Sequence, residues 1–67
     1  MIPSASVAVM DTISYRLVSL WRGQDSERKA RDTASAIRRN CEAQKRPLPK
    51  SIRITVSDAD GVRDIFA

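Results

Sequence analysis

Apolar residues change their spacing twice along this chain, and this feature constrains the fold more than any other. They recur at every second position before residue 23 and again after residue 50, as in strands that bury one face. Between these stretches, Ala30, Ala34, Ile37 and Cys41 recur at spacings of four, three and four, which places them on one side of a helix. The pattern therefore predicts an α+β protein in which a helix separates two β-segments.

The first β-segment follows the odd-numbered positions. Its apolar residues at odd positions are Val7, Val9, Ile13, Tyr15, Leu17 and Trp21. We expect a strand over residues 14–21 with these side chains on its buried side. The even positions also carry Val18 and Leu20, so the end of this strand is either covered on both faces or bulged.

Three alternatives are open for the residues that precede this strand. Residues 5–10 form an extension of it, a hairpin partner that turns at Asp11-Thr12, or a loose N-terminal tail that includes residues 1–7. The hairpin is preferred because it places Ala8 and Met10 beside the apolar residues of the following strand.

A helix is expected over residues 25–44. Asp25 or Ser26 can accept hydrogen bonds from the free backbone N–H groups of the first turn. Three of the four residues on its apolar side are small, so its axis can lie close to a sheet. Pro47 and Pro49 cannot continue a helix, and they lead the chain into an extended link.

The second β-segment forms a hairpin at the end of the sequence. Its alternating pattern places Ile52, Ile54 and Val56 on one face and Arg53, Thr55 and Ser57 on the other. Residues 58–61 have the composition of a turn, and residues 62–66 form the returning strand. We therefore predict an antiparallel three- or four-stranded sheet with one helix packed on one face, as a single domain over residues 1–67.

The inventory of reactive side chains argues against an enzyme. The sequence has no histidine, and one thiol without histidine forms neither a zinc site nor a Cys/His nucleophile pair. A chain of 67 residues also buries only about 60% of its unfolded surface, so a deep substrate pocket would use most of its core. We expect no catalytic activity, no metal or cofactor, and no small-molecule substrate.

The location of the protein is predicted from its cysteine and its hydropathy. Cys41 is the only cysteine and cannot form an internal disulfide, which favours a reducing compartment. No apolar stretch approaches the roughly 20 residues that cross a bilayer. We therefore expect a cytoplasmic protein that has no membrane partner.

Basic residues on the helix are the first candidate site. Twelve Lys and Arg against eight Asp and Glu give a formal charge of +4, which favours acidic partners. Helical geometry places six of the cations on one broad flank away from the apolar side: Arg28, Arg31, Arg38, Arg39, Lys45 and Arg46. This flank is either a solvated surface balanced by pairs such as Glu27–Arg31 and Glu42–Arg46, or a surface that binds a partner together with Arg53.

The open face of the sheet is the second candidate site. It offers Arg53, Thr55 and Ser57, and we expect Ser14 and Arg16 to join them. Single-stranded nucleic acids usually stack their bases on aromatic rings. The aromatic residues are Tyr15, Trp21 and Phe66. All three are assigned to the core side, which weakens the case for a sheet that reads nucleic acid.

The order of elements resembles that of one known group of proteins. A strand or hairpin precedes a basic-flanked helix from Asp25 to Gln44, and the strand from Ser51 to Ser57 turns through Asp58-Ala59-Asp60-Gly61. This arrangement is similar to small phage-encoded anti-CRISPR proteins. The resemblance implies an inhibitor that binds an effector complex stoichiometrically and blocks nucleic-acid recruitment in the cytoplasm of a bacterial host.

Three functional hypotheses follow from the sequence. The leading one is a non-catalytic interaction protein whose arginines engage an acidic protein surface or a nucleoprotein complex. The alternative is direct binding of nucleic acid through the same basic flank. The third is a homo-oligomer that uses an exposed sheet edge or the flank with Ala36 and Ala43.

Overall fold

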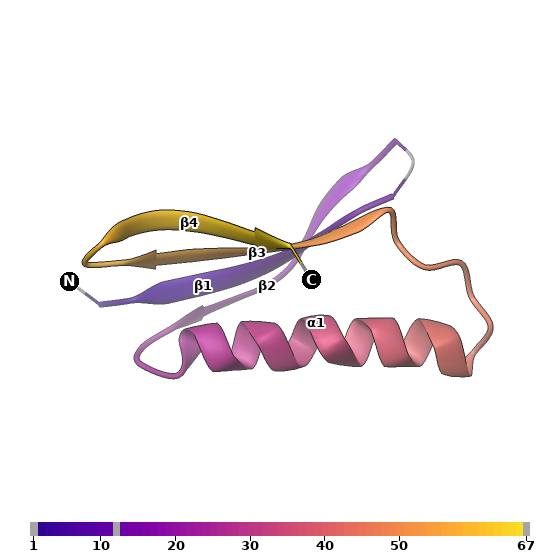
Figure 1. Cartoon of the computed structure of the whole chain (residues 1–67), viewed down its shortest axis with the longest axis horizontal. Helices are drawn as coiled ribbons and strands as arrows, with labels where there is room; N and C mark the ends of the chain where they lie inside the picture. Colours follow the sequence, from indigo (N-terminus) through magenta and orange to yellow (C-terminus); the bar gives the residue numbers. More distant parts are fainter. Residues whose placement is uncertain (1, 12, 67) are drawn as a thin grey trace.

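The structure is a computed structural model that describes residues 2–11 and 13–66. It contains a four-stranded antiparallel sheet with one helix packed on it (Figure 1), which confirms the α+β fold and the four-stranded form of the prediction. The elements are β1 (Ser4–Met10), β2 (Tyr15–Arg22), α1 (Ser26–Ala43), β3 (Ser51–Asp58) and β4 (Gly61–Phe66). In Figure 1 the helix runs along the length of the sheet.

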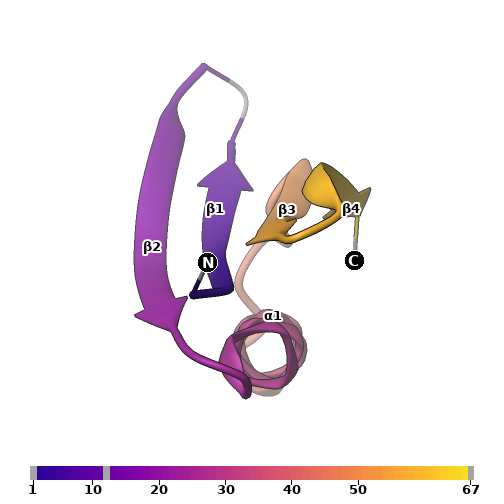
Figure 2. The ribbon, with the colours of Figure 1, turned by 90° about the vertical axis from the view of Figure 1, so that its left-hand side faces the viewer.

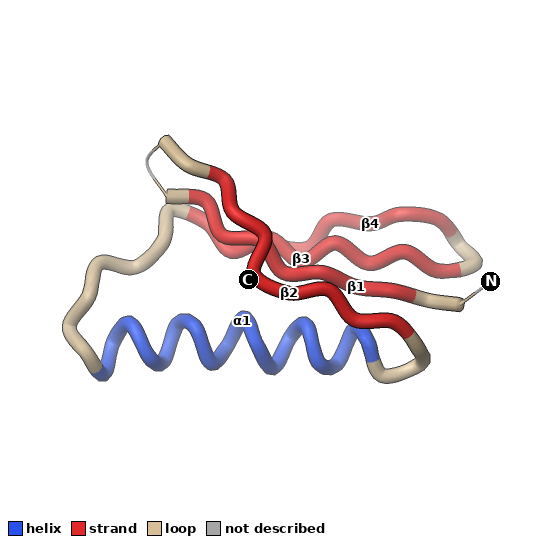
Figure 3. Tube along the Cα trace, turned by 180° about the vertical axis from the view of Figure 1, so that it is seen from behind, coloured by secondary structure: helices blue, strands red, loops and turns tan. Residues whose placement is uncertain are grey.

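Strand β1 lies inside the sheet. The strand order is β2-β1-β3-β4, and β1 pairs antiparallel with both β2 and β3 (Figure 3). The hairpin predicted for residues 5–10 is therefore confirmed. The loose tail is wrong for residues 4–7, which are part of this central strand. The predicted turn residue Thr12 falls outside the described residues.

The register between β1 and β2 decides which side chains face the helix. Met10 lies opposite Tyr15 and Ala8 lies opposite Leu17, as expected for the hairpin. Directly opposite residues share a face, so Tyr15 and Leu17 lie with the even positions of β1, away from the helix. The assignment of these two side chains to the core is therefore wrong. Ile13, also assigned to the core, lies in the connection between the strands and is 99% exposed.

A bulge in β2 reverses the alternation of its faces. Val7 lies opposite Ser19 and Ala8 lies opposite Leu17, so β2 has one extra residue at Val18. Beyond this bulge, Trp21 lies opposite Ala5 and packs against the core, as predicted. The prediction for Phe66 concerns a side chain outside the described part of the structure.

The core lies between the helix and the inner strands. Its buried residues are Ala5, Val7, Ala30, Ala34, Ile52, Ile54 and Val56. Ala30 and Ala34 are almost completely buried, and because their side chains are short, the helix lies close to the strands. Figure 2 shows α1 below β1 and β3, with β4 beyond the helix on one side. Helix α1 contacts β1, β2 and β3, and this partial cover leaves the same face of β4 open.

The C-terminal end of α1 has a Schellman arrangement. The backbone N–H of Arg46 donates to the carbonyl of Cys41 (2.8 Å), and that of Lys45 donates to the carbonyl of Glu42 (3.2 Å). Lys45 has a φ of 54°, in the left-handed region where glycine is usual. The helix therefore ends on a residue type that is strained in this position.

Replacing Lys45 by glycine is expected to raise the free energy of unfolding. Removal of about 1–2 kcal/mol of left-handed strain exceeds the roughly 0.5–1 kcal/mol that glycine costs through the unfolded chain. Urea unfolding of the Lys45→Gly variant measures the gain. The control is Lys45→Ala, which removes the same charge but keeps the strain, so a gain of equal size in both variants would contradict this account.

Candidate functional site

A groove lies between helix α1 and the two strands β3 and β4. It has a volume of about 360 Å³. Ala34, Ile54 and Ile65 form an apolar lining, and the helix adds the residues Arg31, Ser35, Arg38 and Arg39. We call this feature the α1–β4 groove. It brings aliphatic surface and three arginines together in one depression.

Local geometry explains why these residues meet. Arg31 and Arg38 are seven residues apart, which is close to two helical turns, and Ala34 lies between them on the same side. Ile65 lies opposite Ile54 in the ladder between β3 and β4, so both side chains belong to the helix-facing side of the sheet. Because the helix does not extend over β4, Ile65 is only half-buried. The groove is thus the part of the sheet face that one helix leaves open.

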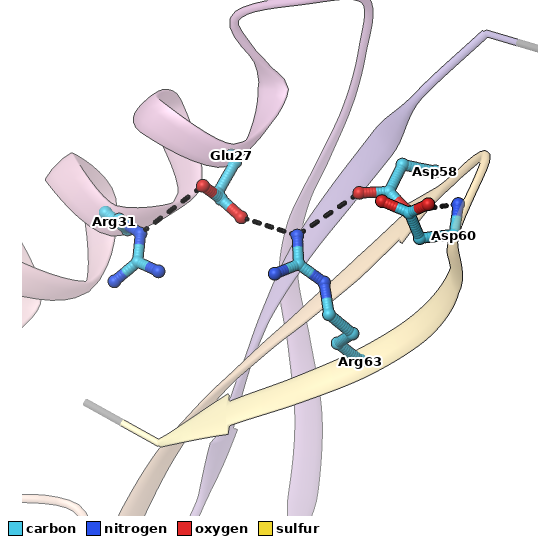
Figure 4. Close-up of polar contacts among 5 residues, drawn as sticks. All are labelled: Glu27, Arg31, Asp58, Asp60 and Arg63. Atoms are coloured by element: carbon cyan, nitrogen blue, oxygen red, sulfur yellow. Dashed lines mark hydrogen bonds and ion pairs between the residues drawn. The ribbon is translucent and has the colours of Figure 1, made fainter.

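A chain of ion pairs connects the start of the helix with the β3–β4 hairpin (Figure 4). Arg63 Nη2 lies 3.0 Å from Glu27 Oε1 and 3.2 Å from Asp58 Oδ2. Glu27 also approaches Arg31, with 3.8 Å between Nε and Oε2, which confirms the predicted Glu27–Arg31 pair. The turn that follows β3 is fixed by the backbone N–H of Asp60, which donates to Asp58 Oδ1 (2.9 Å). These contacts connect β4 to the start of the helix and partly neutralise Arg31.

Replacing Arg63 by alanine is expected to lower the free energy of unfolding by no more than about 1 kcal/mol, because exposed ion pairs contribute little. Arg63 contacts two carboxylates, and its side chain is half exposed. The measurement is urea unfolding at low and at high salt. The difference from wild type should shrink at high salt, because salt screens exposed charges. A difference that does not change with salt would show that Arg63 acts through packing instead.

The helix is neutralised at its N-terminal end and cationic at its C-terminal end. Among the described residues, carboxylates at the start of α1 pair with three arginines. Asp25 pairs with Arg28, and Glu27 pairs with both Arg31 and Arg63. Four cations of the candidate flank take part in no ion pair found within residues 2–11 and 13–66: Arg38, Arg39, Lys45 and Arg46. The pair predicted between Glu42 and Arg46 is therefore absent from this part of the chain. Cations without an ion pair are therefore concentrated at the C-terminal end of α1 and in the residues that follow it.

The structure separates the remaining candidate residues from the groove. Arg28 pairs with Asp25 at 3.5 Å, at the start of the helix. Asp25 makes no side-chain cap hydrogen bond, so the capping role offered for it is wrong. Lys45 follows the end of the helix. Arg53 lies in β3 opposite Ala8, on the face of the sheet that points away from the helix.

Arg46 belongs to a second cavity of about 450 Å³ near the β1–β2 hairpin. Arg16, Val18, Ile37 and Cys41 also line this cavity. Arg16 lies opposite Val9, on the helix side of the sheet. The expectation that Arg16 joins Arg53 on the open face is therefore wrong. The register of the β1–β2 hairpin pairs odd positions of β1 with even positions of β2 in this region, so Arg16 lies on the same face as Val9.

Sequence reasoning missed two residues that shape the groove. Ile65 completes the aliphatic lining, and Arg63 anchors β4 to the start of the helix. The sequence does contain a signal for them, because residues two apart on a strand lie on the same face. Ile65 and Arg63 pair with Ile54 and Val56 and therefore lie on the helix-facing side of the sheet. Pairing of Arg63 with a helix carboxylate depends on the placement of α1, which the period of the sequence does not determine.

Comparisons with known proteins add no relative for this chain. No protein-family model, no curated protein and no solved structure matches it. Within the described residues, no helix is both long enough and apolar enough to cross a membrane.

Proposed function

We propose that this protein is a non-catalytic binding protein whose α1–β4 groove takes an acidic, partly aliphatic segment of a partner protein. The observation that carries this proposal is the combination of Ile54 and Ile65 in the lining with Arg38 and Arg39 beside them. Neither of these two arginines has a carboxylate partner among the described residues. An acidic segment supplies carboxylate partners for these two arginines.

The aliphatic lining favours a protein partner over a nucleic acid. Burying one leucine-sized side chain contributes about 1.5–3 kcal/mol, whereas an exposed ion pair contributes about 1 kcal/mol or less. A peptide can offer both contacts, and its aliphatic side chains match Ala34 and Ile65. Bases instead favour aromatic platforms, and the described residues that line the groove include none.

Inhibition of an effector complex is the form of this function that the resemblance to anti-CRISPR proteins implies. A protein of 67 residues is large enough for this role, because a standard interface needs about 800 Å² from each partner. The corresponding test is whether the purified protein prevents a CRISPR effector complex from binding target DNA at a stoichiometry of one to one.

Direct binding of nucleic acid by the same arginines is the second candidate. Arg38, Arg39, Lys45 and Arg46, the four cations without ion pairs among the described residues, favour it, because phosphate contacts by cations need no aromatic ring. Such binding would be dominated by counterion release. Its logarithmic affinity would therefore fall linearly and steeply with the logarithm of the salt concentration.

A titration with two defined probes tests the proposal. One probe is a helical peptide with glutamates on one side and leucines on the other, and the second is a single strand of poly(dT) with the same number of negative charges. We expect the peptide to bind more tightly and to lose less affinity between low and physiological salt, since part of its binding is apolar. Tighter binding of poly(dT) at physiological salt would contradict the proposal and support the second candidate.

A further inference from the structure

Strand β2 forms one edge of the sheet and carries exposed apolar side chains. It has eight residues, and its outer backbone groups have no neighbouring strand in the order β2-β1-β3-β4. On the face away from the helix, Tyr15, Leu17 and Leu20 are 57%, 59% and 55% exposed. Exposed edges of this kind are templates for pairing with another strand, and proteins usually protect them.

The bulge gives β2 a pattern that is symmetric about the bond between Val18 and Ser19. Tyr15, Leu17, Leu20 and Arg22 lie on the open face, because they are opposite Met10, Ala8, Ser6 and Ser4. Arg16, Ser19 and Trp21 lie on the helix face, opposite Val9, Val7 and Ala5. Val18 has no partner in β1, but it lines the second cavity together with Val9 and Ile37, so it also lies on the helix face. Counting outward from the central bond in both directions therefore meets the same order of faces. A regular strand of eight residues does not have this symmetry, because its faces alternate without interruption.

We propose that a second copy of this chain pairs with β2 in antiparallel orientation, about a two-fold axis between Val18 and Ser19. In this register Leu17 of one copy lies opposite Leu20 of the other. Tyr15 lies opposite Arg22, and Arg16 lies opposite Trp21. Each pair occurs twice, as a two-fold interface requires. The sheet then continues through both copies, with both helices on the same side.

The charges and the faces of the β2 side chains favour this register over its neighbours. Here each arginine faces an aromatic ring, an arrangement in which the cation is attracted to the ring. Moving the axis to Ser19 would place Arg16 opposite Arg22, although Arg16 lies on the helix face and Arg22 on the open face, whereas directly opposite residues share a face. Moving it to Val18 would place Tyr15 opposite Trp21, which lie on opposite faces of the sheet.

This inference is independent of the proposed partner. The α1–β4 groove lies at the other edge of the sheet, so both grooves remain open in the dimer. A dimer of this form would present two grooves to a partner. It would increase the apparent affinity for a partner that carries two acidic segments.

Sedimentation velocity over a series from about 10 µM to about 1 mM tests the dimer. We expect a monomer that becomes a dimer with rising concentration, and a Leu17→Lys variant that needs a roughly tenfold higher concentration. The matched control is Val62→Lys, which adds the same charge at an exposed position of β4 and should dimerise like wild type. A wild type that stays monomeric, or a Leu17→Lys variant that dimerises equally well, would overturn the proposal. If the circular dichroism spectrum of Leu17→Lys shows that this variant is unfolded, Leu20→Lys is used in its place.

Disulfide trapping tests the register. Single variants Leu17→Cys and Leu20→Cys are made in a Cys41→Ser background, mixed in equal amounts and oxidised at a concentration where wild type is dimeric. We expect mass spectrometry to find mainly the mixed disulfide between positions 17 and 20. A majority of disulfides between identical positions would overturn the proposed register.

Discussion

Replacing Arg38 by glutamate is expected to weaken the binding of the acidic peptide probe at least about tenfold, since like charges brought together at an interface cost several kcal/mol. Arg38 lines the α1–β4 groove and has no ion-pair partner in the described part of the chain. The substitution therefore removes one attractive charge and introduces one repulsive charge. Isothermal titration calorimetry measures the change in the dissociation constant.

The chain offers a matched control for this variant. Lys29 is also exposed on α1, but it lies nine residues before Arg38, which corresponds to the opposite side of the helix. Lys29→Glu changes the net charge by the same amount. We expect it to weaken peptide binding less than about twofold, because the effect of a distant exposed charge is screened. Equal losses in both variants would mean that the peptide responds to net charge and not to the groove.

Replacing Ile54 by alanine is expected to lower the free energy of unfolding by about 3 kcal/mol, as is typical of large-to-small changes in a core. Ile54 is almost completely buried in β3, packs in the core and also lines the groove. A protein of 67 residues has a total stability of roughly 3–10 kcal/mol. The variant is therefore expected to be partly unfolded at 37 °C.

Urea unfolding of Ile54→Ala measures this loss. Val62→Ala is the control, because Val62 lies in β4 and is 70% exposed. We expect the control to change stability by less than about 0.5 kcal/mol, as is usual for surface substitutions. A similar small loss in Ile54→Ala would contradict the placement of Ile54 under the helix.

Most of the fold could be predicted from local patterns. Helix α1 begins and ends within one residue of the predicted bounds. The buried side with Ala30 and Ala34, and the prolines shortly after the helix, are signals in the local sequence. The second hairpin was predictable for the same reason: Gly61, with a φ of +116°, begins β4 directly after the turn, and Ile52 to Val56 alternate without interruption.

The faces of β2 could not be predicted in the same way. Tyr15 and Leu17 share the odd positions with Val7 and Val9, yet they lie on the other face of the sheet. The register of the hairpin sets this relation, and the bulge at Val18 then reverses it. A one-residue change of register exchanges the two faces of a strand, so alternation alone does not locate these side chains.

The candidate site was predicted in part. Helical geometry identified Arg31, Arg38 and Arg39 as neighbours on one flank, and the structure places all three in the groove. The groove itself depends on how much of the sheet one helix covers. The sequence does not determine how many strands the helix covers. It also contains no signal that separates Arg53 from the helix cations. That separation follows from the alternation of β3 once α1 is placed on one face.

Backbone amide chemical shifts, followed during titration with the acidic peptide, locate the binding site on the structure directly. We expect the largest shifts at Ala34, Ser35 and Ile65, which line the α1–β4 groove. Amides of the open sheet face, such as those of Thr55 and Ser57, should change little. Shifts concentrated on the open face, or spread evenly over all cationic residues, would contradict the central claim that the groove is the binding site.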